Sequence, residues 1–556
     1  NIFGDEKIYK YIATLKKSNP IEGVTVEEFE TERDLVIGWC NFMKNLDPDI
    51  ITGYNIWGFD WKYIYERALT GNGGLVPPYQ EQVLRILSRV NIDDKGKYKS
   101  KYVEKELQSS ALGQNFLYFI DIEGVVQVDL YKQIMKDYNL TSYKLDAVAE
   151  KFMGQNKEDL KPSEIFSNYR RGTKEDIKQI ATYCVQDCAL CNRLLNKLQV
   201  IPNNVGMGNV CYIPFSYLFL RGQGIKIYSL AIKFCSEEGF LIKNLSEEDI
   251  DKKSYEGAIV FVPEPGIYYD PVAVMDYASL YPSSMIAENI SHDTLIGFKE
   301  YYLKEKKNKK DPDEYELRKD TYNEKYNNLP DYNYTDIEYD LFVGVDKDKR
   351  KVGYKVCRYA EKKNGEKGVL PRILQDLLKA RRDTRKKIKY KTGIAKDGKE
   401  YTGLFEEKDD EYIFKRVEGD KFIVKKEDII EVKDTYTDFQ KAVLDGQQLA
   451  FKVTCNSLYG QVGASTSSIC CKELAASTTA TGRKMVIYAR DYTLEKYQGS
   501  ELVYGDTDSV FFTFNLSDPN TKNKIVGYDA LKYTIEIAQE AAEVCSMFLK
   551  PPMFLE

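Results

Sequence analysis

The nine residues 503–511 (VYGDTDSVF) constrain this chain more than any other stretch, because two carboxylates lie two positions apart between apolar residues. In an extended strand, residues i and i+2 point to the same face, so Asp506 and Asp508 are expected to lie together. Gly505 before them favours a tight turn, which predicts a hairpin with both carboxylates at its tip. Like charges this close repel each other unless a cation lies between them. The motif indicates either an acidic hairpin turn or a site for a hard cation such as Mg²⁺.

A second source of carboxylate is Asp276, which follows an apolar run in the segment 271–284 (PVAVMDYASLYPSS). The run predicts a strand that ends at Asp276. Carboxylates at the ends of separate strands can converge on one site, so Asp276 could form a triad with Asp506 and Asp508. Two divalent ions held by such a triad can clamp the attacking and leaving oxygens of a phosphoryl displacement. A strand-end aspartate in an ordinary turn is the alternative.

Residues 447–460 (QQLAFKVTCNSLYG) predict a helix that carries three different polar groups on one side. Lys452 and Asn456 lie at i and i+4, and Tyr459 follows close to the same face. Gly460 suits a helix C-terminus. A cation, an amide and an aromatic ring in one row could contact phosphate, sugar and base. The end of an ordinary amphipathic helix is the alternative.

Residues 371–390 (PRILQDLLKARRDTRKKIKY) predict another helix, with Pro371 suited to the first helical position. Its apolar residues recur at helical spacing, and two arginines, Arg381 and Arg385, then project at i and i+4. A patch this dense in arginine and lysine suits an oligophosphate. A solvated charged face is the alternative.

Several of these segments together resemble the family B DNA polymerases. DYASLYPS, KVTCNSLYG and YGDTDS occur in the order of motifs A, B and C of that family. GYNIWGFD and YCVQD resemble its second and third exonuclease motifs, and RGQGIK and YEGA resemble the segments that join exonuclease to polymerase. The resemblance covers nearly the whole chain. It implies an α/β and α+β multidomain fold, in which an RNase H-like 3′–5′ exonuclease domain precedes an antiparallel palm sheet, helical fingers and a thumb.

The resemblance implies roles for the residues that match the polymerase motifs. The carboxylates of Asp276, Asp506 and Asp508, with the backbone of Tyr277, would hold two Mg²⁺ ions, which acidify the primer 3′-hydroxyl and neutralise the departing pyrophosphate. Tyr281 matches the steric gate that leaves no room for a ribose 2′-hydroxyl. The remaining nucleotide-binding positions, for the triphosphate and the minor groove of the nascent base pair, are Arg381, Arg385, Lys452, Asn456 and Tyr459.

In the exonuclease, Asp60 and Asp187 match metal-binding carboxylates, Tyr183 matches the tyrosine that orients a water, and Asn55 matches a substrate contact. The first exonuclease motif of the family, a D-x-E pair, is expected before residue 1, so residues 1–556 alone are expected to lack proofreading. The DIE at 121–123 follows the second motif instead of preceding it, and is expected to be a strand or turn segment.

The same landmarks divide the chain. We expect the exonuclease domain at 1–198 without its start, a connecting segment with the first part of the palm at 199–367, the fingers at 368–462 and the second part of the palm at 463–556. The thumb is expected to be absent. Turn signals at 397–398 and 418–420 predict hairpins between the two finger helices. Residues 301–340, rich in Lys, Asp, Tyr and Asn, are expected to form an exposed insertion.

Composition agrees with a large intracellular protein in a reducing compartment. The chain has 556 residues, 11 cysteines and no apolar run of about 18 residues that would predict a membrane span. Its net charge of −6 argues weakly against a nucleic-acid binder. Basic runs at 348–355 and 379–391 outweigh this argument, because the positive charge is concentrated there.

The cysteines and the single histidine offer other readings. Cys184, Cys188 and Cys191 share one helical face, which predicts a buried stripe, with a zinc site as the alternative. His292 is expected in the core or in a turn, and one histidine excludes mechanisms that need several histidine ligands.

The function that the resemblance implies is template-directed DNA synthesis for viral genome replication, because YCVQDCALCNRLLNKL and the long fingers are similar to polymerases of large double-stranded DNA viruses of algae and protists. The implied partners are primer–template DNA, deoxynucleoside triphosphates and a sliding clamp, without a membrane, in the host nucleus or a viral replication factory. A non-catalytic polymerase relative and a stand-alone nuclease are the alternatives, although the second leaves motifs A to C unexplained.

Overall fold

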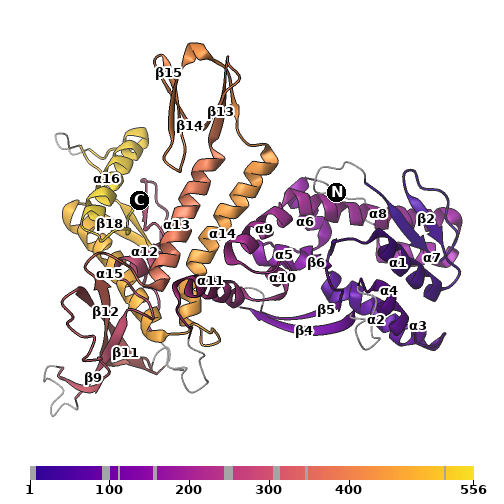
Figure 1. The fold of residues 1–556 in the computed structure, drawn as a ribbon, viewed down its shortest axis with the longest axis horizontal. Helices are drawn as coiled ribbons and strands as arrows, with labels where there is room; N and C mark the ends of the chain where they lie inside the picture. The colour runs from indigo at the N-terminus through magenta and orange to yellow at the C-terminus, as the bar shows by residue number, and fades with distance from the viewer. Residues whose placement is uncertain are drawn as a thin grey trace. The chain divides into compact units, whose positions relative to one another are not determined.

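The computed structural model describes residues 8–89, 100–109, 113–154, 160–242, 255–304, 313–344, 348–518, 521 and 523–556. The chain separates into two compact units (Figure 1). Unit 1 comprises Asn1–Asn209 and Ile213–Gly222, and unit 2 comprises Val210–Tyr212 and Gln223–Glu556. The boundary predicted near residue 198 lies inside unit 1 and stays a prediction. Among the described residues, no helix is long and apolar enough to cross a membrane.

Unit 1 is a mixed α/β structure that contains three two-stranded sheets. β1 (Tyr11–Thr14) pairs parallel with β2 (Thr25–Glu28), β3 (Ile50–Gly53) pairs parallel with β6 (Val126–Asp129), and β4 (Lys101–Ser109) pairs antiparallel with β5 (Gly113–Asp121). The helical segments are α1 (Glu32–Leu46), the π-helical turn η1 (Ile56–Asp60), α2 (Trp61–Leu69), α3 (Gly71–Gly74), α4 (Gln80–Leu87), α5 (Leu130–Asp137), α6 (Leu145–Met153), α7 (Pro162–Arg171), α8 (Lys174–Lys197), α9 (Val200–Cys211) and α10 (Tyr217–Leu220).

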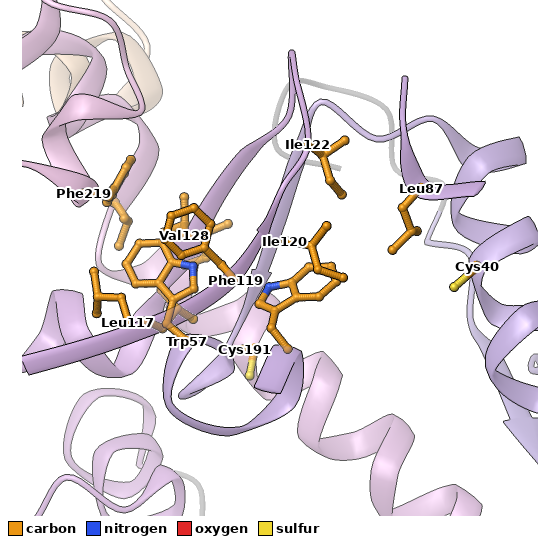
Figure 2. Packing of buried hydrophobic residues seen from close by; sticks show 14 of the residues in the cluster. Cys40, Trp57, Leu87, Leu117, Phe119, Ile120, Ile122, Val128, Cys191 and Phe219 are labelled. Carbon is orange, nitrogen blue, oxygen red and sulfur yellow. The ribbon is translucent and has the colours of Figure 1, made fainter. Parts of the chain in front are cut away.

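The apolar core of unit 1 fixes the segment that follows β3. Figure 2 shows Trp57 of η1 beside residues of β5 and β6, and the cluster also includes Cys191 of α8. The Trp57 side chain is 1% exposed and its ring packs near Phe119, with centroids 6.4 Å apart. Because a buried tryptophan contributes a large apolar area, this contact holds η1, and with it Asp60, against the core.

Unit 2 contains a four-stranded antiparallel sheet in the order β7-β18-β19-β8. Its strands are β7 (Val260–Phe261), β8 (Ala273–Asp276), β18 (Glu501–Asp506) and β19 (Ser509–Thr513), so the predicted strand ending at Asp276 and the predicted hairpin are confirmed. One apolar cluster joins the sheet to α12 (Leu280–Ala287), α15 (Lys472–Lys496) and α16 (Gly527–Met547). Alternate residues of β19, Val510 and Phe512, point into this cluster and are at most 1% exposed.

A second four-stranded sheet follows α12, in the order β10-β9-β12-β11. Its strands are β9 (Leu295–Leu303), β10 (Tyr315–Asp320), β11 (Tyr332–Val343) and β12 (Arg350–Lys362). The exposed insertion expected at 301–340 is therefore wrong for β11, where Ile337 and Tyr339 are buried against α15. Charged residues on the opposite face of β11 concealed this alternation, and residues 305–312 lie outside the described part.

Three helices of unit 2 pack side by side: α11 (Gln223–Glu238), α13 (Val369–Ile388) and α14 (Asp438–Gly463). The predicted helix at 371–390 is confirmed, although it begins earlier, after the N-cap Gly368, so that Pro371 is the third helical residue. α14 begins with a capping box in which Thr437 accepts from Gln440 N–H, and it ends at Gly463 instead of Gly460.

A five-stranded antiparallel sheet, here called the five-stranded sheet, follows α13 and precedes α14 in the chain and extends beyond the ends of these helices (Figure 1). It comprises β13 (Tyr390–Ala395), β14 (Glu400–Lys408), β15 (Glu411–Lys415), β16 (Lys421–Lys425) and β17 (Ile429–Asp434), in the order β16-β15-β14-β13-β17, with the short helix η3 (Lys426–Asp428) before β17. The predicted hairpin turns are confirmed, with Gly398 at φ 81° and Gly419 at φ 109°.

A buried ion cluster connects the β9–β12 sheet to α15. Lys355 Nζ lies 2.9 Å from Glu300 Oε1 and 3.0 Å from Glu473 Oε1, and the Lys355 side chain is 7% exposed. The same ammonium group lies 4.0 Å from the centre of the Phe298 ring. Buried charges are stable only when they are paired, so each carboxylate depends on Lys355.

We expect Lys355→Met to lower the free energy of unfolding by about 3–5 kcal/mol, because it leaves two carboxylates largely buried without a cation. Lys351→Met on the same strand is the matched control. Lys351 pairs with Asp340 at 2.6 Å, but both side chains are about one-third exposed (39% and 34%). That exposed pair should contribute at most about 1 kcal/mol. Urea unfolding of both variants tests the difference, and equal losses would contradict it.

Candidate active site

The β18–β19 hairpin holds its two aspartates in different ways. Asp506 ends β18 opposite Ser509, and the two-residue turn between them is Thr507–Asp508, with Thr507 at φ 58°. The expectation that both carboxylates share one strand face is therefore wrong, because Asp508 belongs to the turn. Gly505 lies within the strand, where a Cβ would stand 2.5 Å from the Phe261 ring. Gly505 is therefore needed for close packing against Phe261, and the positive φ of the turn occurs at Thr507 instead.

Strand pairing brings Asp276 beside this turn. Asp276 is opposite Ser509 in the β8–β19 register, and the backbone N–H of Tyr277 donates to the Asp508 carbonyl oxygen over 2.8 Å. Burial, followed by the charge of Asp508, raises the pKa of Asp276 to about 6. Burial and then the charge of Asp506 also raise the pKa of Asp508. Asp276, which is exposed at the end of β8, and Asp508, which is half-buried, thus form a pair of repelling carboxylates.

The pair fits a hard divalent cation, because carboxylate oxygens are its preferred ligands and a cation would relieve the repulsion. Asp506 has other partners: its Oδ1 accepts from the Thr507 hydroxyl over 2.7 Å and its Oδ2 accepts from the Tyr504 hydroxyl over 3.1 Å. In keeping with this, no three His, Cys, Asp or Glu side chains gather into a ready metal-binding group anywhere in the described residues.

Lys452 of α14 lies near Asp276, and Arg381 of α13 lies near Arg385 and Glu556. Lys452 on α14 is exposed and close enough to lower the pKa of Asp276, against the dominant effect of burial. Arg381 is half-buried on α13, and burial followed by the neighbouring charge of Arg385 lowers its pKa. Within the described part of the chain, Arg381 Nε is buried without a hydrogen bond, and Lys452, Arg381 and Arg385 have no salt bridge. These uncompensated positive charges suit a polyanionic ligand. Asn456, one turn after Lys452, is exposed on the same helix.

Three tyrosines, here called the tyrosine row, lie in succession, and the first of them, Tyr281, lies near Asp508 and Asp506. The rings of Tyr281 on α12 and Tyr459 on α14 have centroids 4.5 Å apart, and the hydroxyl of Tyr459 lies 3.4 Å from that of Tyr255. Burial, followed by the charge of Asp508, raises the pKa of Tyr281 to about 12. Tyr281 therefore stays neutral and is held by packing on one side of the carboxylates.

The predicted exonuclease carboxylates both lie in unit 1, in the surroundings of one cysteine. Asp60 ends η1, and Asp187 lies one turn after Tyr183 on α8. Surrounding protein atoms, followed by the charges of Asp187 and Asp60, raise the pKa of the Cys188 thiol, which places both carboxylates near this sulfur. Burial also raises the pKa of Asp60. The side chain of Asn55, the predicted substrate contact, folds back over Gly58.

Asp129 is a site residue that the sequence analysis missed. Its buried carboxylate accepts backbone N–H groups from Asn55 at 2.8 Å, Trp57 at 3.0 Å and Tyr131 at 3.0 Å. Burial raises its pKa despite these three hydrogen bonds. The carboxylate thereby fixes the loop before Asp60 and caps α5. An aspartate at a strand end just before a helix, in VQVDL, was the available signal.

Other expected positions are settled by burial. Asp121 ends β5 and Glu123 lies in the following turn, both exposed, as expected for the DIE segment. The buried cysteine stripe is wrong for Cys184 and Cys188, which remain accessible to solvent, and only Cys191 is buried. The middle of that helix faces carboxylates instead of apolar residues, which explains the difference.

His292 lies in a turn, as expected, with its Nε2 3.1 Å from the Ile469 carbonyl oxygen. Glu556 was not singled out from the sequence, yet its backbone pairs with Asp276 through hydrogen bonds of 2.8 and 2.9 Å. Its charge is the third cause, after burial and Asp508, of the raised pKa of Asp276.

Comparison with known proteins identifies the family. The family model for DNA polymerase family B matches residues 213–398 and 422–552, and the model for the exonuclease domain of that family matches residues 5–148. Residues 399–421, which separate the two matched parts of the polymerase model, run from the residue before β14 to the first residue of β16 in the five-stranded sheet.

Relatives of known name agree. A DNA polymerase of Pyramimonas orientalis virus is 43% identical over 99% of this chain and 47% of its own length. A DNA polymerase of Phaeocystis pouchetii virus is 32% identical over 99% of the chain and 56% of its length. The DNA polymerase delta catalytic subunit of Oryza sativa subsp. japonica is 32% identical over 97% of the chain and 40% of its length. The chain thus spans about half the length of these curated relatives, and it belongs to the family B DNA polymerases.

Proposed function

We propose that this chain carries the polymerase and exonuclease sites of a template-directed DNA polymerase that adds deoxyribonucleotides to a primer 3′-hydroxyl. The observation that carries the proposal is the pair of repelling carboxylates, Asp276 and Asp508, with Lys452 near Asp276 and Arg381 near Glu556, whose backbone pairs with Asp276. A phosphoryl-transfer site needs both features, because metal ions require carboxylates and a triphosphate requires cations. Family membership supports the same reaction.

The domains of such an enzyme are proposed as follows. Unit 1 is the exonuclease domain, RNase H-like as the family implies, which the match over residues 5–148 supports. The β7-β18-β19-β8 sheet is the palm. The fingers comprise α13 and α14 with the five-stranded sheet. The sequence-based boundaries 1–198, 199–367, 368–462 and 463–556 remain the proposed division, and the absence of a thumb from these residues remains a prediction.

In the proposed polymerase site, Asp276, Asp506 and Asp508, with the backbone of Tyr277, would hold two Mg²⁺ ions. When bound, Mg²⁺ supplies acidity to the primer 3′-hydroxyl and charge neutralisation to the departing pyrophosphate. The primer oxygen attacks the α-phosphate in line, and the bond from that phosphorus to the pyrophosphate oxygen breaks. The chain's own contribution is placement, since strand pairing fixes Asp276 and Asp508 before any ligand arrives.

The proposed nucleotide site lies between the carboxylates and the two long helices. Lys452, Arg381 and Arg385 bind the triphosphate, with Asn456 beside them. Tyr281 is the ring under the deoxyribose, and Tyr459 borders the minor groove of the nascent pair. The contact between these two rings, 4.5 Å between centroids, supports a shared task.

The proposed partners are primer–template DNA, deoxynucleoside triphosphates and a sliding clamp. Two of the named relatives are polymerases of viruses, which supports a role in viral genome replication, in the host nucleus or a viral replication factory. The proposed exonuclease site comprises Asp60, Asp187, Tyr183 and Asn55, and the nearness of Asp60 and Asp187 to Cys188 supports it.

Asp508→Asn is expected to reduce nucleotide addition by orders of magnitude while DNA affinity changes little, because one metal ligand loses its charge. Primer extension is measured with Mg²⁺, without Mg²⁺ and with the matched control Asp529→Asn, an exposed aspartate on α16. Extension that needs Mg²⁺ and Asp508 but not Asp529 distinguishes a polymerase from a non-catalytic relative. Near-normal extension by Asp508→Asn would refute the assignment.

Lys452→Ala is expected to weaken nucleotide binding about ten- to a hundredfold, since a charge-assisted contact is worth roughly 1.5–3 kcal/mol. Lys441→Ala is the matched control on the same helix, where the cation already pairs with Asp434 at 2.7 Å. Single-turnover insertion at varied nucleotide concentration gives the affinity. If primer–template binding weakened instead and nucleotide affinity did not, Lys452 would be a duplex contact.

Asp187→Ala is expected to abolish 3′–5′ degradation of labelled single-stranded DNA, because the exonuclease metals lose a carboxylate. The measurement is made on a protein in which the chain follows the D-x-E motif that the family implies. Asp121→Ala, the exposed aspartate at the end of β5, is the control and should degrade DNA normally. Loss of activity with Asp121→Ala alone would show that the DIE segment is the functional one.

A further inference from the structure

A glycine in the interior of α15 contacts the ring of Tyr281. Gly482 is buried ten residues into this helix, and a Cβ at this position would lie 2.9 Å from Tyr281 Cε1. The same Cβ would lie 3.3 Å from Leu280 Cδ2. Glycine is less favourable than alanine inside a helix, so a packing reason is needed for its presence. The missing side chain leaves the space that the edge of the Tyr281 ring occupies.

The Tyr281 ring has a second neighbour. Tyr281 packs on Tyr459 with an angle of 33° between the ring planes, and the Tyr459 hydroxyl continues to that of Tyr255. At the far end of the tyrosine row, a Cβ on Gly463 would lie 2.3 Å from the Tyr255 hydroxyl oxygen. The row is therefore fitted at both ends against glycines, Gly482 and Gly463, one on each of two helices.

The backbone that carries Tyr255 is attached to the same helix as Gly482. Arg483 donates from Nη1 to the carbonyl oxygens of Glu256 and Gly257, at 2.8 and 2.7 Å, and the Thr479 hydroxyl donates to the Glu256 carbonyl over 2.9 Å. The two ends of the row are thus fixed to α15. Because both ends are fixed, the whole row cannot shift to make room for a new Cβ at position 482. The Tyr281 ring itself must therefore move.

We propose that Gly482 is a specificity-determining position of the polymerase site, because its missing side chain sets how far the Tyr281 ring withdraws from the nucleotide sugar. The inference rests on the proposed role of Tyr281 under the deoxyribose. Gly482 itself does not touch the nucleotide; it is a positioning residue that acts through the ring. The side-chain volume at position 482 therefore determines how much room the site leaves for the sugar of the nucleotide, whether deoxyribose or ribose.

The experiment is a double-variant cycle of Gly482→Ala, Tyr281→Ala and the combined variant, measured by single-nucleotide insertion of deoxyribo- and ribonucleotides. Gly482→Ala is expected to raise the KM for deoxynucleotides roughly tenfold, with a smaller change in kcat, since one added methyl in a packed site costs about that factor. Tyr281→Ala is expected to admit ribonucleotides. In the combined variant, Gly482→Ala should have no further effect on either nucleotide.

The arms separate the two claims. If Tyr281→Ala leaves the discrimination between ribo- and deoxyribonucleotides unchanged, the proposed function of Tyr281 fails. If Tyr281→Ala admits ribonucleotides but Gly482→Ala raises KM equally with and without the ring, Gly482 acts through Leu280 or another neighbour and the inference is overturned. An unchanged KM in the single Gly482→Ala variant overturns it as well.

Thermal unfolding provides a second measurement in case Gly482→Ala folds poorly. A clash with the ring should lower the unfolding midpoint of Gly482→Ala relative to the parent, and removal of the ring in the combined variant should recover it relative to Tyr281→Ala alone. A midpoint that stays equally low in the combined variant shows that the added methyl clashes with something other than the ring, and this result also overturns the inference.

Discussion

Repulsion between two carboxylates is the constraint on which the polymerase half of this molecule depends. Pairing of β8 with β19 forces Asp276 beside the turn that carries Asp508, and burial strengthens the repulsion by removing water. Without other interactions, this repulsion would push the two carboxylates apart. Contacts elsewhere must therefore hold the sheet together. The apolar cluster beneath it, which includes Met275, Val510 and Phe512, supplies that force.

The same helix serves several of these tasks. α15 packs against the apolar cluster beneath the sheet of Asp276 and Asp508, its first turn carries Glu473 of the buried ion cluster with Lys355, and Gly482 lies against the Tyr281 ring. A change in any one of these contacts shifts a helix that the others also use. The position of the Tyr281 ring is therefore linked to the sheet that contains β9 and β12 through one helix.

Sequence patterns were sufficient where local chemistry decides the structure. The strand before Asp276, the hairpin, the arginine helix and the turns at Gly398 and Gly419 each follow from spacing or turn residues. The conformation of Thr507 did not, because a β-branched residue at positive φ contradicts local preference and is imposed by the sheet.

Asp129 and Gly482 were likewise missed, since their roles consist of contacts with segments far away in the sequence. The charged strands of the β9–β12 sheet concealed their buried face for the same reason. The five-stranded sheet, by contrast, begins and ends on neighbouring strands, β13 and β17. Lys391 at its start pairs with Asp434 at its end, so the chain leaves the stalk of α13 and α14 and returns about 5 Å away. The sheet therefore connects α13 to α14 across a distance that a short turn could also span. Changes in the length or composition of this sheet therefore leave the spacing of α13 and α14 unaltered, so sequence can be gained or lost here without moving these two helices.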